Sequence, residues 1–453
     1  MNFIFPFVGS FLYLIIIGAI FLTIFKKSKF WPIFLSVEYF YIIGLGFYPI
    51  FLFLDIVDIP VRYSIYRSVA SFNILTFLHI IFYAIGAAVG FFFCKRFTIV
   101  GSDRLVLISR GLKMKPFRFF YMLAGVAISA ALLYLYLVGF ERAILGASSS
   151  RGGDFSEFAG FEGYVFLKRF TILGLYAIAF FPFIVANNIK VKSSFLILFV
   201  IGILGYMITV SRFALFESIV VPLMIYCSYR LRINIKGFIL LLILIIISYF
   251  VLLYGKEFVQ VFSSYYFLGN RFEFSKSNET GSFFDGFSHL LFSIDAGVAH
   301  YFRSGPFIAH DIFLSFLGFL PSGVFTSLGM SDFSYQLVSD NLKSLCVNTE
   351  IIVGSKDECY IPPYFTGISA YVMPLVGGFI FALFRFYIYS VMHRSWIVLK
   401  NDAYYLVIPY VVFLIANQFM LLIPSTISLA VFFCIIIFLY FSVGRFFRTS
   451  HHR

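Results

Sequence analysis

Apolar runs long enough to cross a lipid bilayer recur along nearly the whole chain, and they constrain its fold more than any other feature. The hydrocarbon core of a bilayer is about 30 Å thick, so each helical crossing needs roughly 20 mainly apolar residues. They predict an all-α integral membrane protein that spans the bilayer many times. The chain offers about 11 such runs: Phe3–Phe25, Trp31–Leu54, Phe72–Cys94, Phe119–Phe140, Tyr164–Ala186, Ser194–Val210, Phe213–Tyr229, Gly237–Tyr254, Tyr364–Ser390, Ala403–Leu422 and Thr426–Val443.

The composition excludes an ordinary soluble protein. Of the 453 residues, 61% are hydrophobic and only 12% are charged, whereas about a quarter of a soluble domain is charged. The net charge of +13 would suggest nucleic-acid binding in a soluble protein, but here most of the excess lies in short connectors, where Lys and Arg orient membrane spans. We therefore expect no nucleic-acid partner. The first run is too long for a cleaved signal sequence and has no basic segment before it, so we expect a retained span.

The basic residues fall in alternate connectors, and this pattern predicts the orientation of the spans. Most Lys and Arg residues lie in every second connector along the whole chain. The positive-inside rule places those connectors in the cytoplasm together with the C-terminus, and it places the N-terminus outside. We expect three parts: a membrane body over residues 1–254, a long folded outer loop over 255–363, and C-terminal spans over 364–453.

The outer loop 255–363 differs in character from the rest of the chain. It is too rich in Phe, Tyr, Leu and Ile to be disordered, and a connection this long is usually functional when it is ordered. We expect it to fold as a cap over the membrane body. Its apolar stretch Phe307–Leu320 is too short to span and predicts a re-entrant or interfacial segment. Cys346 and Cys359 both lie in the loop, and in an oxidising compartment we expect them to form a disulfide.

The strongest candidate for chemistry is an amphipathic helix inside this loop, ended by Gly305-Pro306. At 100° per residue, one sector of roughly 80° holds Asp285, His289, Ser293, Ala296, His300 and Arg303. One interpretation is catalytic: His289 or His300 acts as a general base, and Asp285 orients it. The other interpretation is a helix lying on the bilayer with a hydrated outer face. His310-Asp311 is a weaker candidate pair.

Cations from separate parts of the chain are predicted to gather at the outer face. Simpler explanations exist for several of them: extension of Lys168 or Arg169 to lipid headgroups, anchoring of a helical hairpin by Arg212, or a plain flexible loop around Arg151. Guanidinium groups nevertheless match phosphate oxygens two at a time and stay charged in partly dry surroundings. The set therefore favours a site for a lipid-linked pyrophosphate, and its members are Arg151, Lys168, Arg169, Arg212, Arg271 and Arg303.

Three local features carry a family resemblance. They are Thr209-Val210-Ser211-Arg212-Phe213-Ala214-Leu215, Arg151 in its outer loop, and Tyr364-Phe365-Thr366-Gly367 continuing through Tyr371, Pro374 and Gly377-Gly378. Together with the many spans, the basic inner loops and one long outer loop, they resemble the O-antigen and polysaccharide repeat-unit polymerases (Wzy type), relatives of the O-antigen ligases. The chain departs from that pattern in lacking a clear Glu before the final Gly pair, so no catalytic acid carries over there.

The resemblance implies a GT-C-like, metal-independent glycosyltransferase of lipopolysaccharide biosynthesis, a multi-pass protein of the bacterial inner membrane with a periplasmic N-terminus. It would join a growing glycan from one undecaprenyl pyrophosphate to a repeat unit on another, without a cofactor. Arginines would hold the pyrophosphates, and a loop residue would deprotonate the acceptor hydroxyl. The implied partners are the lipid-linked oligosaccharide and membrane lipid, with a chain-length regulator as a further one.

Two alternatives stay open. An O-antigen ligase would pass the glycan to a lipid A core, and a flippase would transport the same lipid-linked units. A transporter predicts short loops, repeated halves and broken helices near the midplane of the membrane. The long outer loop and the lack of an internal repeat favour an enzyme instead.

Overall fold

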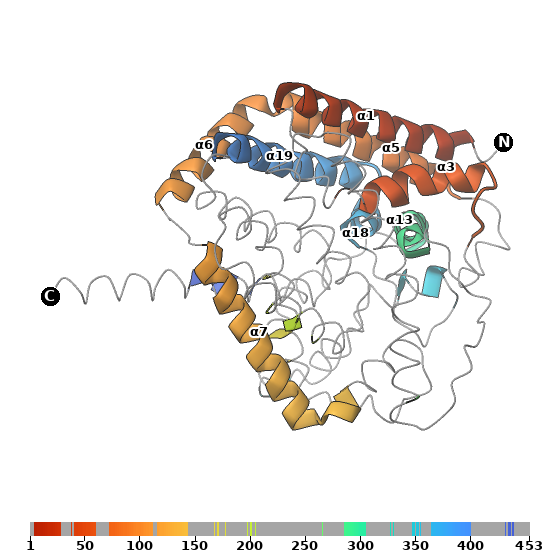
Figure 1. Cartoon of the computed structure of the whole chain (residues 1–453). Helices are drawn as coiled ribbons and strands as arrows, with labels where there is room; N and C mark the ends of the chain where they lie inside the picture. Colours follow the sequence, from red (N-terminus) through yellow and green to blue (C-terminus); the bar gives the residue numbers. More distant parts are fainter. Residues whose placement is uncertain are drawn as a thin grey trace. The chain divides into compact units, whose positions relative to one another are not determined.

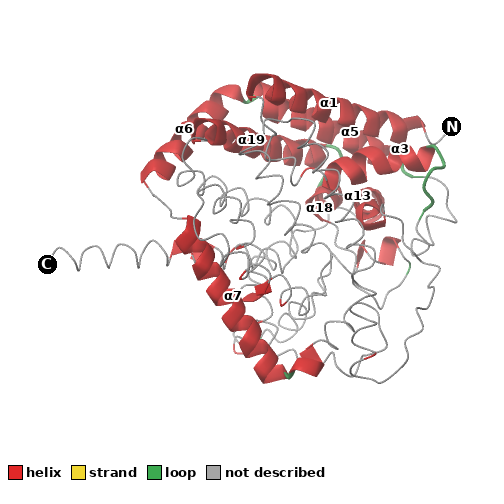
Figure 2. Ribbon diagram, in the orientation of Figure 1, coloured by secondary structure: helices red, strands yellow, loops and turns green. Residues whose placement is uncertain are grey.

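The computed structural model describes residues 4–28, 38, 40–59, 72–111, 116–143, 285–304 and 364–399, with single positions at 167–204, 265, 327–354 and 431–438. Within this part every regular element is a helix and no strand occurs (Figure 2). The all-α prediction is therefore confirmed for the described residues.

The chain divides into two compact units. The first comprises Met1–Gly111, Glu279–Asn401 and Pro409–Ile427, and the second comprises the remainder, including α7 (Pro116–Val138). The predicted boundaries at residues 254 and 363 stay a prediction. The helices described in the first unit (Figure 1) are α1 (Ile4–Ser28), η1 (Ile42–Phe47), α3 (Tyr48–Phe53), α5 (Ile74–Ala88), η2 (Val89–Phe93), α6 (Lys95–Gly111), α13 (Asp285–Ser304), α18 (Tyr364–Val372) and α19 (Val376–Leu399).

Four of the described helices are long and apolar enough to cross a membrane. They overlap four of the predicted runs and support a membrane protein. Their spanning segments are Phe7–Lys26 in α1, Ile74–Phe93 in α5 and η2, Arg118–Val138 in α7, and Val376–Leu399 in α19. The predicted spans between Tyr164 and Tyr254 and those after Ala403 lie outside the residues that the structure describes as continuous helices.

Glycines bring α19 against α5 and η2 at backbone distance. A Cβ at Gly86 would collide with the backbone carbonyl of Phe379, and a Cβ at Gly90 would collide with that of Leu383. The two glycines are one helical turn apart, as are their two partners, so the helices run in the same direction where they touch. Small residues at this spacing let membrane helices approach closely.

The run Tyr364–Ser390, predicted as one span, is broken between α18 and α19. Pro374 cannot continue α18, and Leu375 has a φ of 67°, in the left-handed region that residues other than glycine rarely adopt. His79 of α5 stabilises the break: the Leu375 N–H donates to its Nδ1 at 3.1 Å, and its Nε2 lies 3.2 Å from the Ser369 hydroxyl. The prediction of one continuous span was wrong here, because a side chain distant in sequence accepts from the Leu375 N–H, which is left without a helical partner at the break.

The basic connector after Cys94 forms the helix α6. Its buried face packs against α19, and the Ser395 hydroxyl of α19 donates to the Ser102 carbonyl at 3.4 Å. The segment contains five charged residues, which make its helical pattern of buried positions hard to recognise in the sequence. The residues of the buried face are Thr98, Ser102, Leu105, Val106 and Ser109.

In the second unit, α7 ends at Gly139, whose φ of 87° is the left-handed conformation common after a helix C-terminus. Its buried side packs with the short helical segment that follows. This apolar cluster consists of Ala131, Tyr134, Val138 and Ala143, with Leu135, Leu167 and Leu204 against it.

Candidate functional site

The predicted candidate helix exists and is built into the first unit. α13 packs against α18, η1 and α5 (Figure 1). Ser293 and Ala296, on the predicted polar side, are fully buried, and so are Leu291 and Val298 on the opposite side. The interpretation of α13 as a surface helix with a hydrated outer face is therefore wrong for its middle part, because protein covers both sides of the helix there.

The predicted catalytic residues of α13 lie at its two ends. His289 and His300 are half-buried and Arg303 is exposed. Eleven residues separate the two histidines, which places them about 16 Å apart along the axis at 1.5 Å per residue, so they cannot act on one reacting group. Asp285 begins the helix one turn before His289, and its side chain lies outside the description. Of the two histidines, only His289 is therefore near enough along the helix to pair with Asp285.

A chain of polar contacts joins the middle of α13 to α18. The side-chain amide of Asn348 forms both contacts. Its Nδ2 donates to the Ser293 hydroxyl at 3.0 Å, and its Oδ1 accepts from the Tyr371 hydroxyl at 2.9 Å. The ring of His300 lies against Tyr371, with 5.4 Å between the ring centroids. The predicted base His300 thus contacts the glycine-containing motif that follows the long loop.

Asp295, which the sequence pattern did not single out, fastens α13 to the start of α5. Its Oδ1 accepts from the Asn73 N–H at 2.9 Å and from the Thr76 hydroxyl at 2.5 Å. Asn73 is itself the N-cap of α5, and its side chain accepts from the Leu75 N–H. Because the first N–H groups of a helix lack partners inside the helix and favour a nearby negative charge, Asp295 completes this cap.

Asp295→Ala is expected to lower the free energy of unfolding by about 1.5–3 kcal/mol, the usual contribution of hydrogen bonds to a charged group. Asp295→Asn keeps an acceptor oxygen and should cost less. Denaturant titration of the detergent-solubilised protein measures both. Equal stability of the alanine variant and the parent would show that the contact contributes nothing.

The other predicted site residues lie outside the described part of the chain. Their convergence on a pyrophosphate, and the disulfide, stay predictions. They are Arg151, Lys168, Arg169, Arg212 and Arg271, with His310, Asp311, Cys346 and Cys359.

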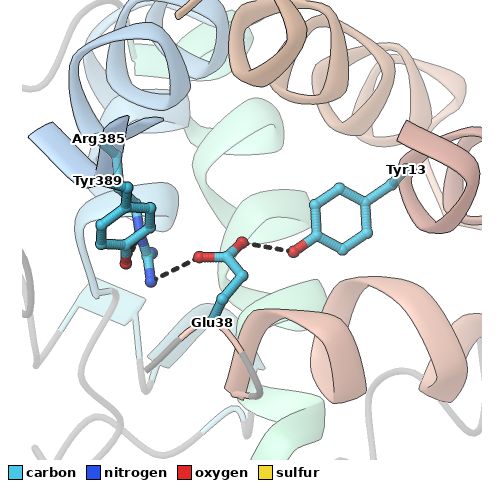
Figure 3. A network of polar contacts seen from close by, with 4 residues as sticks. All are labelled: Tyr13, Glu38, Arg385 and Tyr389. Carbon is cyan, nitrogen blue, oxygen red and sulfur yellow. Dashed lines mark hydrogen bonds and ion pairs between the residues drawn. The ribbon is translucent and has the colours of Figure 1, made fainter. Parts of the chain in front are cut away.

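The structure reveals a second candidate, an ion pair buried among the spans of the first unit (Figure 3). Nη2 of Arg385 on α19 lies 2.9 Å from Oε2 of Glu38, and both side chains are 1% exposed or less. The Tyr13 hydroxyl of α1 donates to the other carboxylate oxygen at 2.6 Å. Nε of Arg385 donates to the Tyr389 hydroxyl at 2.6 Å. The pair therefore ties together α1, the segment at Glu38 and α19.

Aromatic rings enclose this ion pair. The guanidinium carbon of Arg385 lies 3.6 Å from the ring centre of Tyr41, a cation–π contact that gains strength away from water. Tyr83 of α5 stacks on Tyr41 with 6.2 Å between centroids and meets the Tyr13 ring edge-on at 5.7 Å. Nη1 of Arg385 makes no hydrogen bond to a described residue.

The ion pair lies part-way along a helix that is long and apolar enough to cross a membrane. Arg385 is nine residues into the span that starts at Val376, about 14 Å along the helix and close to the middle of a hydrocarbon core about 30 Å thick. Ionisable residues at that depth are costly and are typical of functional sites or of buried pairs. The signal was present in the sequence: Glu38 and Arg385 are each the sole charged residue of their predicted run, and they have opposite signs.

Comparison with protein-family models, with curated proteins and with solved structures finds no match to this chain. Within the described residues, no group of three or more His, Cys, Asp or Glu side chains is placed to hold a metal ion.

Proposed function

We propose that this protein is a membrane glycosyltransferase that polymerises undecaprenyl-pyrophosphate-linked oligosaccharide repeat units at the outer face of the bacterial inner membrane. The observation that carries the proposal is the contact of His300 with Tyr371, whose ring centroids are 5.4 Å apart. His300 belongs to the predicted catalytic helix, and Tyr371 belongs to the motif on which the family resemblance rests. Two features selected separately from the sequence thus lie together.

In this proposal His300 accepts the proton of an acceptor sugar hydroxyl as that oxygen attacks the anomeric carbon of the donor. The bond from that carbon to the pyrophosphate oxygen breaks, and undecaprenyl pyrophosphate leaves with the electron pair. Arg303, one turn after His300 and exposed, stabilises the charge that develops on the phosphate.

His300→Ala is expected to lower chain extension by about 10²–10⁴-fold, the usual contribution of a general base. Phe302→Ala is the matched control, because Phe302 lies on the same turn and is 62% exposed. Each variant is expressed in a strain lacking the native gene, protein level is checked by immunoblot, and glycan length is read from a gel. Normal chain lengths in the His300 variant would remove His300 from the reaction.

Arg212→Ala is expected to abolish long-chain glycan while expression stays intact, since the leaving pyrophosphate would lose its bidentate partner. The species that accumulates in a deletion strain separates the alternatives. Single repeat units on lipid A indicate a lost polymerase, free long chains without attachment indicate a lost ligase, and lipid-linked units held at the inner face indicate a lost flippase.

A transporter for the same lipid-linked units is the second candidate, because ion pairs within membrane spans are a feature of transporters. The neutral double variant Glu38→Met with Arg385→Met separates the two candidates. Under the polymerase proposal it keeps chain extension, because the pair then acts only in packing. Loss of transfer of lipid-linked units across proteoliposomes, with the protein still folded, would favour the transporter.

A further inference from the structure

The face of α6 that does not contact α19 carries an exposed apolar stripe. Phe97 is 72% exposed, Val100 53%, Leu107 69% and Ile108 50%. At 100° per residue these four positions fall within a sector of about 100°. Their sector lies opposite the buried face that contains Ser102 and Ser109, so packing within the unit does not account for it.

Cations lie within this stripe and along one of its edges. Arg96 and Arg110 lie two turns on either side of Asp103 along one edge of the stripe, and Arg104 lies within it. All four charged side chains are exposed. With Lys95, α6 carries four cations and a single acid. Such a surface complements negative charge rather than a neutral or basic partner.

α6 also continues directly from a membrane span. A single residue, Cys94, separates the apolar segment Ile74–Phe93 from α6. Phe93, at the end of that segment, is 79% exposed. The chain bends at Cys94, whose ψ is 23°, and α6 turns away from the direction of α5 (Figure 1). If the span fills the hydrocarbon core, α6 starts at the level of the lipid headgroups.

We propose that α6 is an interfacial helix that binds the headgroups of anionic phospholipids. Phe97, Val100, Leu107 and Ile108 enter the boundary between headgroups and acyl chains, and Arg96, Arg104 and Arg110 bind phosphate oxygens. Apolar burial and attraction to anionic lipid act together in such helices, and arginine matches the phosphate with two parallel N–H donors. The helix would thereby fix the depth of the α5–α19 pair in the membrane.

The test uses the full-length protein in nonionic detergent and measures its affinity for fluorescent phosphatidylglycerol and for phosphatidylcholine with the same acyl chains. The parent is expected to prefer phosphatidylglycerol, and the preference should weaken with added salt. Arg96→Gln with Arg110→Gln should lower the affinity for phosphatidylglycerol by about fivefold per arginine removed. Arg96→Lys with Arg110→Lys keeps the charge and should retain most of the binding.

Asp103→Asn is the matched control on the same exposed edge, and it should raise the affinity for phosphatidylglycerol because it removes the one acid. Thermal unfolding of each variant shows whether the fold is kept, as expected for exposed positions. Equal affinity of the parent for the two lipids would overturn the proposal. So would unchanged lipid preference in the folded double glutamine variant, because the selectivity would then reside elsewhere on the chain.

Discussion

Replacement of Glu38 by alanine, with Arg385 left in place, is expected to destabilise the folded protein by about 3–5 kcal/mol, the usual cost of breaking a buried ion pair. The guanidinium would stay at mid-depth with its main partner removed, since Glu38 and Arg385 are almost wholly excluded from solvent. The Tyr13 hydroxyl would lose its acceptor at the same time. Denaturant titration in detergent, followed by circular dichroism, measures the loss.

A double variant that removes both charges gives this prediction its control. Glu38→Met with Arg385→Met should be far more stable than Glu38→Ala alone, because apolar residues of similar volume replace a buried pair at little cost. Tyr13→Phe removes one hydrogen bond to a charged group and should cost about 1.5–3 kcal/mol. A cost below about 1 kcal/mol for Glu38→Ala, the range of exposed pairs, would mean that water reaches the pair and that the core is not dry.

Gly86→Leu is expected to separate α19 from α5 and to prevent the native packing of the first unit. A side chain at Gly86 would meet the backbone of Phe379, which has no rotamer by which to move aside. Overpacking of a core costs about 1–3 kcal/mol even where side chains can yield, so a backbone collision should exceed that range. The expected result is a strong fall in the yield of folded protein and in its melting temperature.

Gly18→Ala provides the matched control, because no other group lies within 4 Å of a Cβ added there. Alanine inside a helix is favoured over glycine by about 0.5–1 kcal/mol, so this variant should be as stable as the parent or slightly more stable. A folded Gly86→Leu protein that melts with the parent would contradict the close approach of the two helices. Fluorescence-detected size-exclusion chromatography before and after heating compares the two variants directly.

The periodicity of the long loop predicted α13 nearly to the residue, because Gly305-Pro306 is a strong end signal. It did not predict that the helix is covered on both sides. Ser293 and Ala296 are small enough to be buried, and Asn348 supplies a hydrogen-bond partner for the hydroxyl. Helical periodicity records polarity along one helix, whereas burial depends on which other elements pack against it.

The ion pair also shows that a sequence pattern can mark a residue without predicting its contacts. Glu38 and Arg385 are conspicuous as lone charges in apolar runs, and this signal could have led to the pair. Their contact joins residues far apart in the chain, and no local pattern states which charge meets which. The cation cluster predicted at the outer face was inferred in the same way from scattered residues, and of its members the structure describes Arg303.

The membrane class, the helical character of the described chain and the positions of four helices long enough to span could all be predicted from the apolar runs, because a hydrocarbon core tolerates only long apolar stretches. Three features became evident only from the tertiary structure. His79 stabilises the break at Pro374, and Gly86 and Gly90 allow α5 and η2 to contact the backbone of α19. Glu38 forms its ion pair with Arg385. These features depend on groups brought together across hundreds of residues, where close packing and the cost of an unpaired charge select one arrangement.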